Sequence, residues 1–299
     1  MSQATLRVQK ISAHSGSIPG EDAQRHEYTV CKLIDTTTCI GCKACEVACM
    51  EWNDLPFTDT VFGNTYQTMP ENTWKYWNLI KFNEHETADG SLMWLMRKNQ
   101  CMHCADPGCL AACPSDGAIV QYANGIVDFQ QANCIGCGYC ITGCPFDIPK
   151  MNPETHRVFK CTLCSDRVSE GLEPACIKSC PTGCLHFGTK DDMLDLANKR
   201  AKQLQDHSGY AHAGVYDPQG VGGTGVIYVL HDATNPESYG GLPANPTVPW
   251  TVRLWKGPLK WLGNAAMIGG LIGLFAHYLR FGPKAREDED ISLPEGKQP

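Results

Sequence analysis

Cys134-Ile-Gly-Cys-Gly-Tyr-Cys-Ile-Thr-Gly-Cys-Pro145 is the stretch around which the chain is organised. Its first three cysteines are separated by two residues each, so one short loop can bind three corners of an iron–sulfur cube. The fourth cysteine follows after three residues and precedes a proline. In proteins with two clusters, a cysteine at this place binds the neighbouring cluster. The spacing therefore predicts paired [4Fe–4S] clusters.

Related cysteine sets occur three more times, and we number all four in chain order. Quartet one is Cys39, Cys42, Cys45 and Cys49; quartet two is Cys101, Cys104, Cys109 and Cys113; quartet three is Cys134, Cys137, Cys140 and Cys144; quartet four is Cys161, Cys164, Cys176 and Cys180. Quartet one has Met50 where the others have proline, and quartets two and four have a longer gap in the middle. These sixteen of the 18 cysteines are enough for four [4Fe–4S] clusters.

The composition argues against other uses of the cysteines. Disulfide frameworks are typical of small secreted domains, whereas this chain has 299 residues and metal-type spacing. A scaffold protein that binds structural zinc is the alternative of another class, but three cysteines crowded into one loop suit a cube better than one tetrahedron. The net charge of −7 argues against nucleic acid as a partner. Residues 1–20 lack an apolar h-region, so we expect no secretory signal peptide.

The turn signals indicate how the quartets pair. Ile119-Val120 and Ile126-Val127 flank Asn124-Gly125, which favours a tight hairpin between quartets two and three. By elimination, quartet one pairs with quartet four across the insertion 50–100, in which a second hairpin is expected around Asp89-Gly90. The predicted fold class is α+β, with two ferredoxin-like modules formed by nested pairing of half-motifs, 1-4 and 2-3, and a single C-terminal transmembrane helix.

Exchange of the last cysteine between paired quartets gives four predicted ligand sets. Set A is Cys39, Cys42, Cys45 and Cys180; set B is Cys161, Cys164, Cys176 and Cys49; set C is Cys101, Cys104, Cys109 and Cys144; set D is Cys134, Cys137, Cys140 and Cys113. Cys31 fits no ligand spacing, and Cys184 aligns with Ala118 of the other module, so we interpret both as small buried residues.

The rest of the chain suggests five parts. After quartet four, residues 189–207 read as an amphipathic helix capped by Thr189, and the glycines of 220–225 precede a strand, which is the wrong order for a nucleotide loop. Residues 232–249 look like a surface linker. We expect an N-terminal arm (1–30), a four-cluster domain (31–189), a helix, strand and linker extension (190–249), a transmembrane anchor (250–282) and a polar tail (283–299).

Residues 261–279 contain no acid, lysine or arginine. At about 1.5 Å per residue they span roughly 28 Å, close to the thickness of a bilayer core, and a helix buried in the protein core is the alternative. Ala265, Gly269, Gly273 and His277 recur every four residues, a spacing that lets a partner helix approach closely. His277 either binds a haem carried by that partner or forms an interfacial hydrogen bond. Lysine and arginine flank both ends, so the orientation is not encoded.

The predicted chemistry is single-electron transfer, with the conversion of a substrate left to another subunit. No catalytic triad, paired carboxylates or phosphate loop stands out, so we expect no catalytic residue in this chain. Lys43 and Lys160 lie beside cluster cysteines and either offset the negative charge of the clusters or are solvated. His103 either tunes a cluster or caps a loop.

The chain resembles the beta subunits of the respiratory formate dehydrogenases of the N and O types. The resemblance covers about residues 32–283 and rests on Cys39-Ile-Gly-Cys-Lys-Ala-Cys-Glu-Val-Ala-Cys-Met-Glu-Trp-Asn, Cys101-Met-His-Cys-Ala-Asp-Pro-Gly-Cys-Leu, Tyr122-Ala-Asn-Gly-Ile-Val-Asp-Phe, His212-Ala-Gly-Val-Tyr and Gly220-Val-Gly-Gly-Thr. The quartets alone belong to a broad superfamily. The other stretches and the single C-terminal span narrow the resemblance to the formate dehydrogenase subunits.

The resemblance implies two partners: an alpha subunit whose molybdenum or tungsten pterin oxidises formate, and a membrane cytochrome b gamma subunit that reduces quinone. It also implies export of the folded complex, with the soluble part on the periplasmic side of the inner membrane. Related nitrate reductase subunits replace one ligand with tryptophan, which this chain does not. The alternatives are an electron-transfer subunit of a membrane hydrogenase or of another molybdopterin oxidoreductase, and a soluble polyferredoxin.

Overall fold

The computed structural model describes residues 10–12, 29–57, 65–86 and 90–282. The chain divides into two compact units, Met1–Arg253 and Leu254–Pro299, which we describe separately. The predicted turn at Asp89, most of the arm and the polar tail lie outside the described residues.

The first unit is built on a four-stranded sheet in the order β10-β11-β2-β9. Its central strand, β2 (Val30–Asp35), is buried along its whole length and pairs in parallel with β11 (Val226–Leu230) and antiparallel with β9 (Leu185–Thr189). The glycines before β11 therefore lead into a strand, as predicted. β10 (Gly214–Tyr216) completes the sheet.

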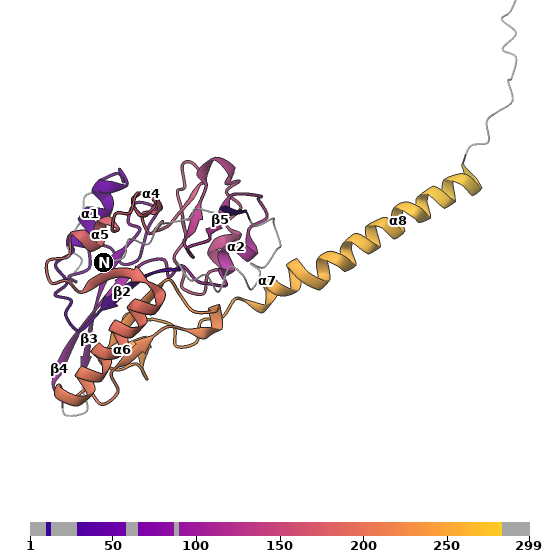
Figure 1. The fold of residues 1–299 in the computed structure, drawn as a ribbon. Helices are drawn as coiled ribbons and strands as arrows, with labels where there is room; N and C mark the ends of the chain where they lie inside the picture. Colours follow the sequence, from indigo (N-terminus) through magenta and orange to yellow (C-terminus); the bar gives the residue numbers. More distant parts are fainter. Residues whose placement is uncertain (1–9, 13–28, 58–64, 87–89, 283–299) are drawn as a thin grey trace, which may run out of the picture. The chain divides into compact units, whose positions relative to one another are not determined.

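The amphipathic helix predicted from residue 189 onwards is α6 (Lys190–His207), which packs on β2, β9, β10 and β11 (Figure 1). Thr189 caps it by accepting a hydrogen bond from the backbone N–H of Asp192 at 3.2 Å. Met193, Ala197, Ala201 and Leu204 form its buried face. The spacing of these residues explains both the helix and the side that it buries.

The nested pairing of the half-motifs is confirmed. α1 (Ala44–Trp52) of the first half-motif packs against α5 (Ala175–Lys178) of the fourth, and β2 pairs with β9. α2 (Gly108–Ala112) packs against α3 (Tyr139–Thr142), and β5 (Ile119–Tyr122) forms the predicted hairpin with β6 (Val127–Phe129). Part of the arm lies on the body, because β1 (Lys10–Ser12) pairs with β5.

The insertion contains the second predicted hairpin, β3 (Leu79–Glu86) and β4 (Leu92–Asn99). Its first strand begins at Leu79, because the indole Nε1 of Trp77 donates to the carbonyl oxygen of Trp74 at 2.9 Å and holds the preceding residues in a turn. The remaining elements are short: β7 (Lys150–Met151), β8 (Val158–Phe159), α4 (Ser165–Ser169), and 3-10 turns at Gln131–Asn133, Gln219–Val221 and Pro236–Ser238.

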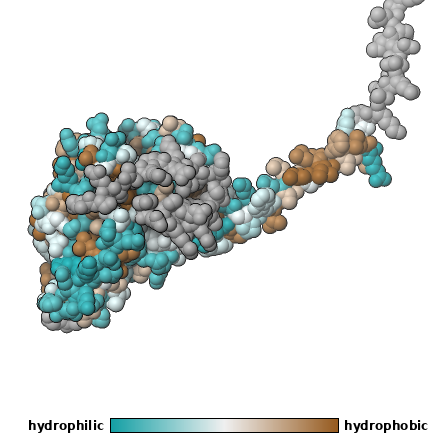
Figure 2. All heavy atoms as spheres, in the orientation of Figure 1, coloured by the Kyte–Doolittle hydropathy of each residue, from teal (hydrophilic) through white to brown (hydrophobic). Residues whose placement is uncertain are grey.

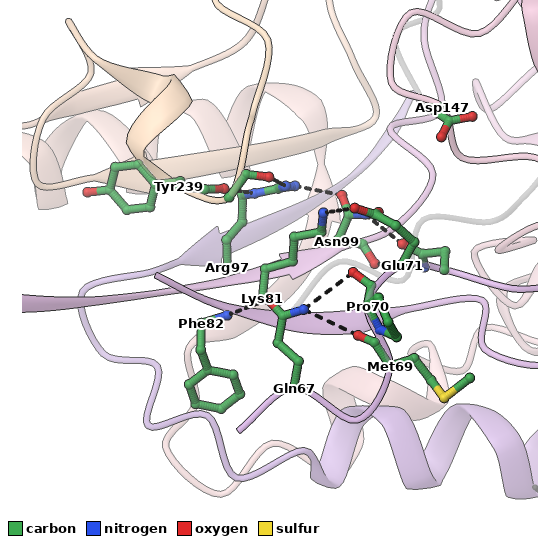
Figure 3. Close-up of polar contacts among 12 residues, drawn as sticks. Gln67, Met69, Pro70, Glu71, Lys81, Phe82, Arg97, Asn99, Asp147 and Tyr239 are labelled. Atoms are coloured by element: carbon green, nitrogen blue, oxygen red, sulfur yellow. Dashed lines mark hydrogen bonds and ion pairs between the residues drawn. The ribbon is translucent and has the colours of Figure 1, made fainter. Parts of the chain in front are cut away.

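The interpretation of residues 232–249 as a surface linker is wrong. Tyr239 and Leu242 are each only 1% exposed. Arg97 of β4 donates from Nε to the carbonyl oxygen of Tyr239 at 2.5 Å and from Nη2 to that of Gly240 at 3.2 Å (Figure 3). The segment follows an irregular path but is packed, since its backbone carbonyls are satisfied by a buried guanidinium.

The predicted anchor begins with the last residues of the first unit and continues through the second. Trp250–Phe281 is long and apolar enough to cross a membrane and is not buried in the protein, so the interpretation as a core helix does not hold. It consists of α7 (Trp250–Leu254), a five-residue π-helical segment (Trp255–Leu259) with non-helical Gly257, and α8 (Lys260–Phe281). Apolar residues cover much of the visible face of α8 (Figure 2).

Candidate metal centres

The four cysteines of set A surround one cavity. Cys39, Cys42 and Cys45 come from the loop before α1 and the start of that helix, and Cys180 comes from the end of α5. Lys43 is in the left-handed conformation (φ 61°), which turns the loop so that successive cysteines can face the same centre. The packing of α1 against α5 thus brings the last cysteine of quartet four to quartet one.

A fifth cysteine, Cys184, also lines this cavity. Its Sγ lies 3.5 Å from the Sγ of Cys180, and hydrogen bonding to Cys39 and burial raise the pKa of its thiol. Cys184 is buried, as interpreted from the sequence, but its place beside the set A cysteines was not predicted. The alignment of Cys184 with Ala118 could have indicated this place, because Ala118 lines the corresponding cavity of the other module.

The four cysteines of set D surround that second cavity. Cys134 and Cys137 come from the loop before α3, Cys140 lies in the first turn of that helix, and Cys113 directly follows α2. The cavities of sets A and D have similar empty volumes, about 360 and 320 Å³. In the described ranges, no three Cys, His, Asp or Glu side chains converge on a single-ion position. The cysteines of each of these two sets line a cavity instead.

Set B is brought together in the interior. Burial raises the pKa of the Cys49 thiol, and the charges of Cys161, Cys176 and Cys164 add to this rise, so Cys49 of α1 lies among three cysteines of quartet four. Burial also acts on Cys176, but Lys32 and Lys98 outweigh it and leave the pKa of this thiol below its ordinary value.

Set C is assembled in the same way. Burial and the charges of Cys101, Cys144 and Cys109 raise the pKa of Cys104 well above its ordinary value. Burial likewise raises the pKa of Cys144 to about 11. Desolvated thiols of this kind favour the protonated form until a metal binds them as thiolates. The residues therefore fit groups that supply strong positive charge to each sulfur set.

Contacts between the sets define one order. Cys45 of set A and Cys176 of set B belong to one buried group of side chains. Cys161 of set B and Cys101 of set C share a second group, and Cys109 of set C and Cys140 of set D share a third. The order is A, B, C, D.

The two ends of this order are the most exposed. Cys42 of set A and Cys137 of set D are exposed, whereas all four cysteines of set B are buried. Ile40 and Ile135 follow the first cysteines of quartets one and three and are 60% and 67% exposed. Each end of the order of sets therefore has an exposed isoleucine in its cysteine loop.

The other candidate residues have defined places. His103 is buried, and its Nδ1 accepts a hydrogen bond from the backbone N–H of Val127 at 3.1 Å, so it caps β6 rather than facing solvent. Burial, with Lys160 and Lys32, holds the pKa of His103 well below its ordinary value. Lys160 is 3% exposed and donates to the carbonyl oxygen of Cys161 at 3.0 Å, so the solvated interpretation is wrong for it. Lys43 lines the set A cavity.

Cys31 and the four residues of the predicted helix face belong to none of the sulfur sets. Cys31 is fully buried between the sheet and α6, and burial raises its thiol pKa to about 12, as expected for a structural cysteine. Ala265, Gly269, Gly273 and His277 are on α8, none of whose residues is buried.

Comparison with known proteins identifies related chains over almost the whole length. Two families described as 4Fe-4S dicluster domains match residues 92–190 and 38–118, and a family described as formate dehydrogenase N, transmembrane, matches residues 248–290. The iron-sulfur subunit of the nitrate-inducible formate dehydrogenase of Escherichia coli is 54% identical over 97% of this chain and 98% of its own. The formate dehydrogenase-O iron-sulfur subunit of the same organism is 55% identical over 99% and 98%. The formate dehydrogenase iron-sulfur subunit of Haemophilus influenzae is 54% identical over 95% and 91%.

Proposed function

The chain belongs to the iron–sulfur subunits of the formate dehydrogenases, and from this premise we propose how its centres are used. It is an electron-transfer subunit with four [4Fe–4S] clusters and a single membrane span. We propose that it relays electrons from a molybdenum or tungsten alpha subunit that oxidises formate to a cytochrome b gamma subunit that reduces quinone. On this proposal sets A to D are the ligands, and no residue of the chain is catalytic.

The order of the sulfur sets carries the proposal. Each [4Fe–4S] cluster, when bound, takes up and releases single electrons at a potential set by its charge, hydrogen bonds and exposure. The protein keeps set B inside and exposes part of sets A and D. Ile40 and Ile135 offer an apolar contact at each end, where a docked partner would exclude water. This arrangement supports a path in which electrons enter at one end of the order and leave at the other.

The point at which the anchor joins the first unit supports one direction of electron transfer. Arg253, the last residue of the first unit, donates from Nη2 to Oδ2 of Asp106 at 2.8 Å, in the loop of quartet two. Quartet two supplies ligands to sets C and D only. We therefore assign set D to the membrane partner and set A to the catalytic partner.

Several finer assignments belong to the same proposal. Ala265, Gly269, Gly273 and His277 form the face of α8 that meets a helix of the gamma subunit, since small residues allow close approach. The soluble unit faces the periplasm. The five parts keep their predicted bounds, with 190–249 as a packed extension of the cluster domain.

The test uses electron paramagnetic resonance (EPR) on isolated membranes before and after formate is added under argon. The native chain is expected to give the signal of several interacting reduced clusters, absent from a strain without the chain. Cys137→Ala should change one cluster and stop quinone reduction, while formate oxidation with an artificial dye continues. Cys31→Ala, which removes a buried cysteine outside the four sets, is the matched control.

Two outcomes would contradict the proposal. Undiminished quinone reduction by Cys137→Ala would exclude a serial path through set D. Clusters that dithionite reduces but formate does not would leave the electron carrier intact and require another donor, with hydrogen as the first to try.

A further inference from the structure

Two lysines of the first unit, Lys32 and Lys98, are buried beside the sulfur sets. They are 0% and 2% exposed. Within the described ranges neither forms an ion pair with a carboxylate. An unpaired buried ammonium group costs several kcal/mol. Some other negative charge must therefore compensate them.

Both lysines converge on one side chain, that of Gln100. The Nζ of Lys32 and the Nζ of Lys98 each donate a hydrogen bond to Oε1 of Gln100, at 3.2 and 2.5 Å. Gln100 is itself 1% exposed, and its Nε2 has no hydrogen-bond partner among the described residues. A single amide oxygen thus holds two like charges close together, which is unfavourable unless both face negative groups.

The negative groups are the sulfur sets A and B. The Nζ of Lys32 lies 3.1 Å from the Sγ of Cys176, a member of set B. Lys98 lines the cavity of set A and also acts electrostatically on Cys49 and Cys176 of set B. The opposite charge of a thiolate ligand this close favours the charged form of Lys32.

We propose that Lys32 and Lys98, positioned by Gln100, form a fixed positive charge between sets A and B that raises the reduction potential of the two clusters there. A [4Fe–4S] cluster with four thiolates has a formal charge of about −2, which becomes about −3 on reduction. Nearby ammonium groups stabilise the more negative, reduced form. The inference rests on the proposed ligand sets and adds residues that ligate nothing.

The inference is tested by redox titration of the complete complex, followed by EPR. Lys32→Met is expected to lower the potential of the set B cluster, and Lys98→Met that of set A or B. Each should change the reduction equilibrium at least tenfold, which is 59 mV for one electron. Gln100→Glu keeps both lysines but adds a negative charge between them, and it should lower the potentials of sets A and B together.

Two controls separate the charge from a structural role. Lys32→Arg keeps the charge and should restore the native potential. Lys190→Met removes a lysine that is ion-paired with Asp217 at 2.8 Å and donates to the carbonyl oxygen of Thr224 at 2.6 Å. Neither partner belongs to the four sets, so this variant should leave all potentials unchanged.

Unchanged potentials in Lys32→Met, Lys98→Met and Gln100→Glu, with all iron retained, would overturn the inference. If Lys32→Met loses iron, Gln100→Glu decides: a lowered potential supports the inference and an unchanged one overturns it. The native complex is titrated first with formate. Failure of formate to reduce its clusters would count against the proposed function alone.

Discussion

Replacing Gly108 with alanine tests the contact that holds quartets two and three together. Gly108 of α2 faces Gly143, which follows α3, and a Cβ at Gly108 would lie 2.2 Å from the carbonyl oxygen of Gly143. Favourable contacts begin near 3.5 Å, so the two segments would have to separate by about 1 Å. Cys109 and Cys113 move with α2.

The size of this shift decides which effect dominates. Overpacking alone costs about 1–3 kcal/mol, which a folded domain can tolerate. Metal ligands tolerate displacements of only about 0.2 Å. A movement of about 1 Å at Cys109 and Cys113 should therefore remove the clusters of sets C and D while the sheet and α6 stay folded.

The assay counts iron and acid-labile sulfide per chain in the anaerobically purified complex. Because the cytochrome partner carries haem iron of its own, the variant is compared with the native complex, and Gly108→Ala should contain about eight iron atoms and about eight sulfides fewer per complex. The matched control is Gly188→Ala, because a Cβ there meets only the flexible end of Met193 at 3.0 Å. Full iron content in Gly108→Ala would refute the argument that this glycine contact sets the spacing of the two quartets.

Three further changes have expected outcomes. Thr189→Ala removes the hydrogen bond to the N–H of Asp192 and should destabilise the first unit by about 1 kcal/mol in thermal unfolding, whereas Thr189→Ser should not. Cys180→Ala should keep a four-iron cluster at set A, because the Sγ of Cys184 lies 3.5 Å from that of Cys180 and can replace it as a ligand. Only the double variant with Cys184→Ala should give a three-iron EPR signal. Equal loss of the four-iron cluster in the single and double variants would show that Cys184 does not replace Cys180. Deletion from Leu254 onwards should release the chain, expressed without partners, from the membrane fraction, and persistent attachment would contradict the anchor.

The cysteine spacing allowed the fold class to be predicted because one requirement, three ligands on a short loop, also fixes the local turn and the helix that follows. The Asn124-Gly125 hairpin then paired two quartets and left the other two to pair with each other. The path of residues 232–249 could not be predicted in this way. Its order comes from Arg97, which is more than a hundred residues earlier and carries no local signal for its carbonyl partners.

The same limit applied to single residues near the sulfur sets. Lys160 and Cys184 have ordinary sequence surroundings, and their roles depend on which strand or cavity the fold places beside them. Lys32 lies in β2, and no cluster cysteine adjoins it in the sequence. Its burial follows from the strand being central in the sheet, and its contact with Cys176 follows from the pairing of quartets one and four. The burial and contacts of these residues therefore depend on long-range topology and could not be predicted from the local sequence pattern.

The parts of the chain that supply no ligands explain why the inner sets are buried. All four quartets begin with two cysteines separated by two residues, and this shared spacing does not explain why some are buried and others exposed. Trp77 of the insertion and Phe146 pack against the buried group that contains Cys101 and Cys161, where sets B and C meet. Tyr239 belongs to the core that contains cysteines of sets A, B and C. Because solvent exposure changes the potential of a cluster, these segments act on electron transfer by excluding water between the ends, while Cys42 and Cys137 remain at the surface where partners can dock.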